Sequence, residues 1–252
     1  MQPPKEKYED TFIKPLVRAG EFPQQFDLST SVEALLLTAM QANGAQLAAP
    51  TSGPSTAEDM DLSLRAHESL VGNFSEVILG GYRLTDERLA ETWEKITGNV
   101  PEELQISEEK DPWTITFARR QPVAAVFGDG TARFAVRGRA FSRGDTVLRD
   151  PIEISASYSL ERTPTGTKLT RQGEVAVDFL RSGGRLNVRQ ITFKTFLRRK
   201  FSAIFKESIV RDGLQLGGNL EKRGKLQLAR LESGNGWIAL GWNLPPEEQG
   251  AE

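Results

Sequence analysis

Apolar and polar residues alternate through the middle of the chain. The segment 152–161 (IEISASYSLE) has an apolar residue at every second position, with serine or glutamate between them. Similar alternation surrounds Phe134 and Val177, and the turn residues 128–130 (GDG) and 164–166 (PTG) separate the alternating segments. This pattern is typical of antiparallel strands that bury one face and expose the other. It predicts an antiparallel meander.

Two segments before the meander repeat apolar residues with the period of a helix. The first, 69–79, is predicted to end at Gly80 and Gly81. Its expected apolar stripe is Leu70, Phe74, Val77 and Ile78. The second follows Thr85, a residue type that caps helices. Its expected stripe is Leu89, Trp93 and Ile96.

A third helix is predicted over about Phe193–Val210, after the meander. Its expected apolar stripe is Phe193, Leu197, Phe201, Ile204 and Ser208, widened by Phe196 and Phe205. Its basic residues are Lys194, Arg198, Arg199, Lys200 and Lys206, opposed only by Glu207. A basic amphipathic helix can contact an anionic membrane surface or an acidic protein. The alternative is a core helix whose polar face is simply solvated.

Together these elements predict an α+β fold, in which a long curved antiparallel meander wraps around two or three amphipathic helices. We expect a single domain over residues 1–252. Within it, 1–49 would supply N-terminal strands that pack on the main sheet, and 50–60 a mobile linker. The main α+β body would span 61–244, followed by a polar tail at 245–252.

Composition narrows the function classes. Hydrophobic residues make up 38% and charged residues 26% of the chain, which is ordinary globular usage. The formal net charge of −2 argues against a general nucleic-acid binder. The chain has no cysteine, which excludes thiol nucleophiles, disulfides, iron–sulfur clusters and zinc sites with sulfur ligands. We expect no cofactor and no metal.

No apolar run approaches the roughly 18 residues that span a bilayer. The first residues (MQPPKEK) also lack the apolar region of a signal peptide. The sequence leaves the compartment open, and a cell-envelope location is expected if the chain is a mature form.

Candidate catalytic groups are few. His67 is the only histidine, and without an accompanying nucleophile motif we expect it to satisfy backbone groups at a helix start.

Arg133, Arg137 and Arg139 form an arginine cluster on one predicted strand. We expect them to pair across strands with Glu153, Glu161, Glu174 or Asp178 rather than to bind an anion. The sequence therefore predicts that the protein is not an enzyme.

The order of elements over about 61–244 is similar to the tubular lipid-binding superfamily, which includes the bactericidal permeability-increasing proteins. That resemblance implies an elongated apolar interior that holds a lipid. The strings 45–50 (AQLAAP), 64–74 (LRAHESLVGNF), 112–118 (PWTITFA) and 236–242 (GWIALGW) resemble segments of uncharacterised proteins from planctomycete bacteria. This second resemblance implies no established activity, but makes an envelope-associated location an expectation.

The leading hypothesis is a non-enzymatic binding domain for a lipid or another apolar ligand, held between the sheet and the helices. It requires a pocket of roughly 300 Å³ or more. The expected lining residues are Phe74, Ile78, Trp93, Phe117, Phe134, Phe196, Phe201 and Phe205. The alternative is a structural or protein-interaction module with a solid core, in which the same residues pack together.

Overall fold

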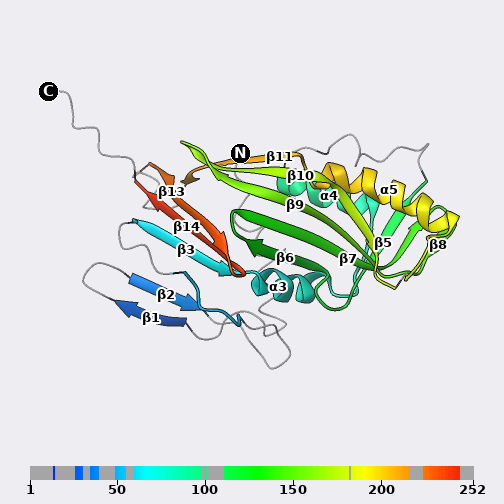
Figure 1. The fold of residues 1–252 in the computed structure, drawn as a ribbon, viewed down its shortest axis with the longest axis horizontal. Coiled ribbons are helices and arrows are strands. Elements are labelled where there is room, and N and C mark those ends of the chain that lie inside the picture. The colour runs from blue at the N-terminus through cyan, green and yellow to red at the C-terminus, as the bar shows by residue number, and fades with distance from the viewer. Residues whose placement is uncertain are drawn as a thin grey trace.

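The computed structural model describes residues 14, 26–30, 35–39, 49–54, 60–97, 100, 111–181, 183–215 and 224–244. Most of these residues belong to antiparallel sheets, and three helices pack against the largest sheet (Figure 1). The α+β fold class predicted from the sequence is confirmed.

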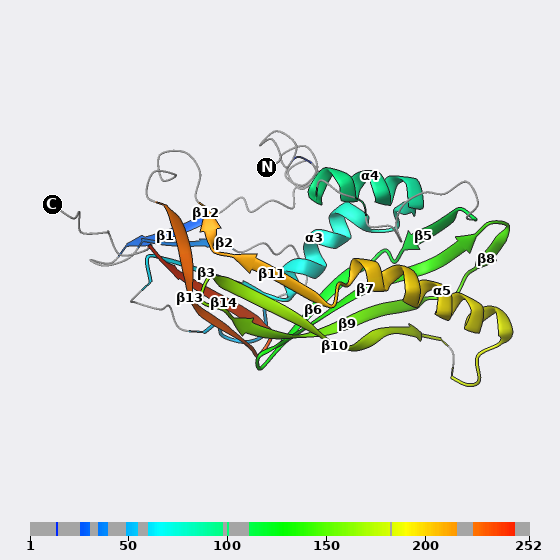
Figure 2. The ribbon, with the colours of Figure 1, turned by 90° about the horizontal axis from the view of Figure 1, so that it is seen from above.

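The main sheet has eight strands, in the order β11-β10-β9-β7-β5-β4, with β6 and β8 also paired to β7. Its strands are β4 (Arg83–Thr85), β5 (Trp113–Phe117), β6 (Val123–Gly128), β7 (Thr131–Arg143), β8 (Thr146–Leu148), β9 (Ile152–Arg162), β10 (Gly166–Phe179) and β11 (Ser208–Asp212). All of its pairings are antiparallel, as the alternating sequence predicts. The sheet curls strongly into a half-barrel (Figure 2).

Three helices pack on one face of this sheet: α3 (Ser69–Leu79), α4 (Asp86–Thr97) and α5 (Val188–Ile204). Leu79 of α3, Leu89 of α4 and Phe193 of α5 all contact the same core cluster. From the sheet, that cluster takes alternate residues such as Ile152 and Ile154, which are fully buried. This face is the apolar side of the meander, and α5 lies along β9 and β10 (Figure 2).

A second sheet continues from one end of the first (Figure 1). It has the order β12 (Leu214–Gln215), β13 (Lys225–Gly234), β14 (Trp237–Asn243), β3 (Leu62–His67). β13 and β14 form a hairpin whose turn residues, Asn235 and Gly236, have φ values of 51° and 82°. Asn-Gly with two positive φ angles matches the twist of a tight hairpin.

The two sheets are joined at their turns. The amide of Gly236 donates to the Phe127 carbonyl at 3.0 Å, and the Ser233 hydroxyl donates to the Gly128 carbonyl at 2.7 Å. The Glu68 carboxylate, just before α3, accepts from the amide of Phe127 at 2.9 Å. Three segments far apart in the sequence thus meet where the sheets join.

The N-terminal strands β1 (Phe26–Thr30) and β2 (Leu35–Ala39) pair with each other in a separate two-stranded sheet. The expected packing of 1–49 on the main sheet remains a prediction. In the predicted linker, Thr51 is held by Trp237, whose indole Nε1 donates to the Thr51 carbonyl at 3.2 Å. The mobility expected for this linker also remains a prediction, and residues 55–59 lie outside the described residues, as does the predicted tail at 245–252.

The third predicted helix was misplaced by several residues. α5 begins at Val188 because Asn187 and Gln190 form a capping box, in which each side chain accepts from the other residue's amide. Its C-terminal end lies at Ile204, and Ser208 pairs with β10 as the start of β11. The helical stripe predicted to continue to Ser208 is therefore wrong at its C-terminal end.

The predicted stripe of α3 is also wrong, although the bounds of the helix are correct. The buried residues are Gly72, Asn73 and Ser75, whereas Leu70 is exposed. Ser75 explains this orientation, because its hydroxyl donates to the Val123 carbonyl at 2.8 Å and accepts from the Val123 amide at 3.1 Å. Small residues let the helix approach β6 closely enough for those bonds.

Candidate functional site

The concave face of the half-barrel is filled by the apolar side of α5. Five residues of the helix and its C-terminal cap are buried there, and they are Phe193, Phe196, Leu197, Phe201 and Phe205. They share one core cluster with Ile154, Tyr158, Val175 and Val177 of β9 and β10. Edge-to-face ring contacts occur within it, such as Trp113 with Phe196 at 6.2 Å between centroids.

The structure brings most of the predicted lining residues together. Phe117, Phe134, Phe196, Phe201 and Phe205 all belong to, or pack against, this cluster. Two other predicted residues, Phe74 and Ile78, are half-buried on α3, whose cluster contact is made by Leu79 instead. Trp93 lies on α4, and its side chain is outside the described part of the chain.

The C-terminal end of α5 is tied to the sheet. The Tyr158 hydroxyl on β9 donates to the Lys206 carbonyl at 3.1 Å, and the Arg171 guanidinium on β10 donates to the Phe205 carbonyl. Arg171 also pairs with Glu207 at 3.5 Å. Burial raises the pKa of the Tyr158 hydroxyl, and the nearby Arg171 charge offsets part of that rise. The hydroxyl therefore stays protonated and keeps donating at neutral pH.

The N-terminal end of α5 has a lighter attachment. One side-chain hydrogen bond to the sheet region is described there, from Gln190 Nε2 to the Asp150 carboxylate at 3.2 Å. The connection from β10 includes Gly183 and Gly184, and nothing lies within 4 Å of where a Cβ on either would sit. Glycine adopts a wider range of backbone conformations than other residues, and both of these glycines lie in open space.

The predicted anion-contacting residues do not form one surface. Arg199 and Lys206 are exposed, Lys194 is half-buried, and Arg198 pairs with Glu174 at 2.9 Å. Lys200 is only 7% exposed, so its prediction as a surface contact is wrong. It lies four residues after Phe196 and seven after Phe193, which places it on the buried stripe.

Three exposed arginines that no sequence-based prediction included lie just before and at the start of α5, and they are Arg181, Arg185 and Arg189. A usable signal was present, because no aspartate or glutamate occurs from 179 to 206. The helix predicted from the sequence begins at Phe193, so these arginines lie outside it.

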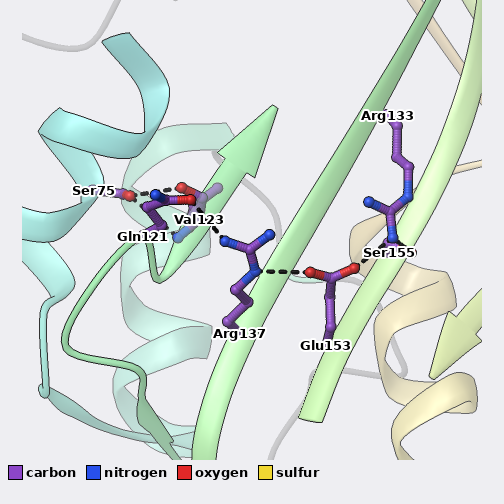
Figure 3. Close-up of polar contacts among 7 residues, drawn as sticks. All are labelled: Ser75, Gln121, Val123, Arg133, Arg137, Glu153 and Ser155. Atoms are coloured by element: carbon purple, nitrogen blue, oxygen red, sulfur yellow. Dashed lines mark hydrogen bonds and ion pairs between the residues drawn. The ribbon is translucent and has the colours of Figure 1, made fainter. Parts of the chain in front are cut away.

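The convex face of the sheet carries a polar network around Glu153 (Figure 3). This carboxylate pairs with Arg133 and, at 2.7 Å, with the Nε of Arg137. The Nη1 of Arg137 donates to the side-chain oxygen of Gln121 at 2.8 Å. Glu153 is only 9% exposed. Burial by itself raises its pKa, but the hydrogen bonds from Arg137 and Arg133 outweigh burial and hold the pKa below the ordinary value.

This network confirms the predicted cross-strand pairing for two arginines of the cluster, while Arg139 is exposed. It links β7, β9 and the β5–β6 connection. A carboxylate held by two guanidinium groups has little capacity to accept a proton, so its arrangement suits a structural role.

His67 performs the predicted local role. Its Nδ1 accepts from the Ser69 amide at 3.2 Å and lies 2.9 Å from the Ser69 hydroxyl at the start of α3. The ring also packs edge-to-face on Trp237, with centroids 5.1 Å apart. The prediction that His67 satisfies a helix start is confirmed.

A shallow pocket of about 190 Å³ lies beside Trp237. Its lining residues are Ser52, Pro54, Glu232, Ser233, Gly234, Asn235 and Trp237. Drug-sized ligands usually occupy at least roughly 300 Å³, and none of the predicted lining residues borders this pocket. It is not the apolar site that the sequence predicts.

Among the described residues, no group of three or more acidic or histidine side chains is placed to hold a metal ion. No helix in the described part of the chain has both the length and the apolarity to cross a membrane. No family model matches the sequence, and no curated protein matches it.

Proposed function

We propose that this protein is a non-enzymatic binding domain for a lipid or another apolar ligand, which takes the place of α5 side chains on the concave face of the half-barrel. The observation that carries the proposal is the unequal attachment of α5. Its C-terminal end is bonded to β9 and β10, whereas one described side-chain hydrogen bond holds its N-terminal end, at Gln190.

The chemistry of the covered surface suits an acyl chain. Side chains facing α5 include Ile154, Val175 and Val177, which offer an apolar surface without directional requirements. Fully burying an apolar side chain contributes about 1.5–3 kcal/mol, so lifting Phe193, Phe196 and Leu197 costs about 5–9 kcal/mol. Burying roughly ten methylenes of an acyl chain contributes about 8 kcal/mol of favourable free energy. Burial of an acyl chain can therefore offset the free energy lost when the N-terminal half of α5 leaves the sheet.

One polar atom of α5 also favours its release. The Nε of Arg198 is buried with no hydrogen-bond partner in the described part of the chain. Removing an unsatisfied donor from water costs free energy. α5 is therefore held less firmly than a helix without such an atom would be.

Native mass spectrometry of the purified protein, followed by solvent extraction of bound molecules, tests this proposal. We expect a stoichiometric acyl species, or uptake of one after incubation with mixed lipids. Phe201→Asp should abolish uptake, and a circular dichroism spectrum checks that the variant folds. Thr195→Asp, on the exposed side of α5, is the matched control. An apo mass that persists after lipid incubation would contradict the proposal.

The second candidate is a structural or protein-interaction module with a solid core. The close packing of α5 phenylalanines against β9 and β10 favours it. It predicts that no apolar molecule enters the half-barrel under any condition in which the protein stays folded.

A further inference from the structure

Three aliphatic side chains are exposed where β10 ends and α5 begins. Leu180 is 56% exposed, Val188 81% and Ile191 53%. The Leu180 amide donates to the Pro151 carbonyl at 2.9 Å, and Gln190 donates to Asp150 at 3.2 Å. The end of β10 and the first turn of α5 therefore flank the same dipeptide and lie at one end of the molecule (Figure 2).

The same place is strongly basic. Arg181, Arg185 and Arg189 are exposed, and none has an ion-pair partner among the side chains that the structure describes. Asp150 accepts a hydrogen bond from Gln190 in the first turn of α5. The first turn of α5 contains no acidic residue, so the positive end of the helix dipole adds to this potential. We call these three arginines, with Leu180, Val188 and Ile191, the tip surface.

We propose that the tip surface docks on a lipid bilayer that contains anionic lipids. The arginines would contact headgroup phosphates, while the three aliphatic side chains enter the boundary between headgroups and acyl chains. Arginine forms paired hydrogen bonds with phosphate. This combination of exposed aliphatic and basic residues is that of interfacial membrane segments.

A bilayer fits these observations better than an acidic protein or a nucleic acid. The aliphatic residues project from the end of the molecule, and neither an acidic polypeptide nor a phosphate backbone would remove them from water. The inference goes beyond the proposed function, because it rests on exposed residues and does not require an occupied half-barrel. Docking would, however, place a membrane at the lightly attached end of α5.

Vesicle co-sedimentation tests the inference with two lipid compositions. We expect binding to phosphatidylcholine mixed with phosphatidylglycerol, no binding to phosphatidylcholine alone, and weaker binding as salt rises. Each arginine near an anionic surface contributes about five-fold to partitioning, so R181Q/R185Q/R189Q should bind roughly a hundred-fold more weakly. The matched control is R119Q/R120Q/R139Q, which removes the same charge from exposed arginines elsewhere. Equal loss in both triple variants would overturn a localised tip surface.

Insertion of the tip surface into the bilayer is measured separately from binding. The chain has no cysteine, so Ile191→Cys can carry a single environment-sensitive fluorophore such as acrylodan. We expect a blue shift of its emission on anionic vesicles, and none for the same label at Arg119→Cys. Binding without a shift at 191, or binding to polyglutamate but not to vesicles, would overturn the bilayer proposal. Acyl-chain uptake is measured without vesicles, so the proposed function and this inference can fail separately.

Discussion

Arg137 of β7 donates from Nε to the carboxylate of Glu153, the residue directly opposite it on β9, over 2.7 Å. Arg133 donates to the other carboxylate oxygen, so the buried Glu153 carboxylate forms ion pairs with two arginines on the convex face. This relationship holds the two central strands in register on the face opposite α5. The convex face therefore stays fixed if α5 moves.

Replacing Glu153 with glutamine should destabilise the fold. Glu153→Gln leaves two guanidinium groups without their counter-charge, and we expect a loss of about 1–3 kcal/mol in the free energy of unfolding. Urea denaturation followed by circular dichroism measures this. Glu161→Gln, an exposed site on the same strand, should change it by less than about 0.5 kcal/mol. Similar losses at both positions would contradict the special role of Glu153.

The same pair predicts a pH dependence. The pKa of Glu153 in the folded protein lies below its ordinary value of 4.5, so the unfolded chain binds the proton more readily. The stability contributed by this carboxylate is therefore present above about pH 4.5 and is lost as pH falls through the folded pKa. The stability difference between the native protein and Glu153→Gln should shrink in that window. A difference that stays constant down to pH 3 would contradict this account.

Ser75→Ala tests why α3 turns its small residues toward β6. The substitution leaves the carbonyl and amide of Val123 without the hydroxyl that bonds both. We expect a loss of about 1–3 kcal/mol, since unsatisfied buried groups keep their desolvation cost. Thermal unfolding reports it, with Leu70→Ala on the exposed side as control. If Leu70→Ala costs more, the sequence-based stripe would be the better description.

Phe201→Ala should create a cavity beneath α5. Phe201 is buried beside Phe205, and phenylalanine-to-alanine changes in cores cost about 3–5 kcal/mol. Denaturant unfolding measures the loss. Thr192→Ala lies on the exposed side of the same helix and should have an effect within about 0.5 kcal/mol. A small effect at Phe201 would mean that α5 is already loosely packed in the free protein.

The meander was predictable because the period of two repeats over several strands and its turns contain glycine or proline. The bounds of α3 followed from Gly80 and Gly81, but its buried face did not. Apolar periodicity assumes that the largest residues face the core, whereas here Ser75 makes the defining contacts. The start of α5 was missed for a related reason, since its signal is the Asn187–Gln190 capping box rather than an apolar stripe.

The candidate site could be predicted only in part. The phenylalanines of α5 face the sheet as their spacing requires, and Lys200 follows the same spacing into the interior despite its charge. The positive charge of Lys200, taken alone, predicts a surface position. The tip surface depends on the end of β10 and the first turn of α5 both bonding to the dipeptide Asp150–Pro151, which is a tertiary relationship.

The most direct test of the account locks α5 to the sheet at its lightly attached end. Asp150→Cys and Gln190→Cys replace the two residues that bond there, and a short thiol-cleavable bismaleimide joins them in a chain that has no other cysteine. Titration with cis-parinaric acid then reports acyl-chain uptake through its fluorescence. We predict uptake by the unjoined variant, no uptake by the joined one, and recovery after the linker is cleaved. Equal uptake in the joined and cleaved states, or none in either, would contradict an apolar site beneath α5.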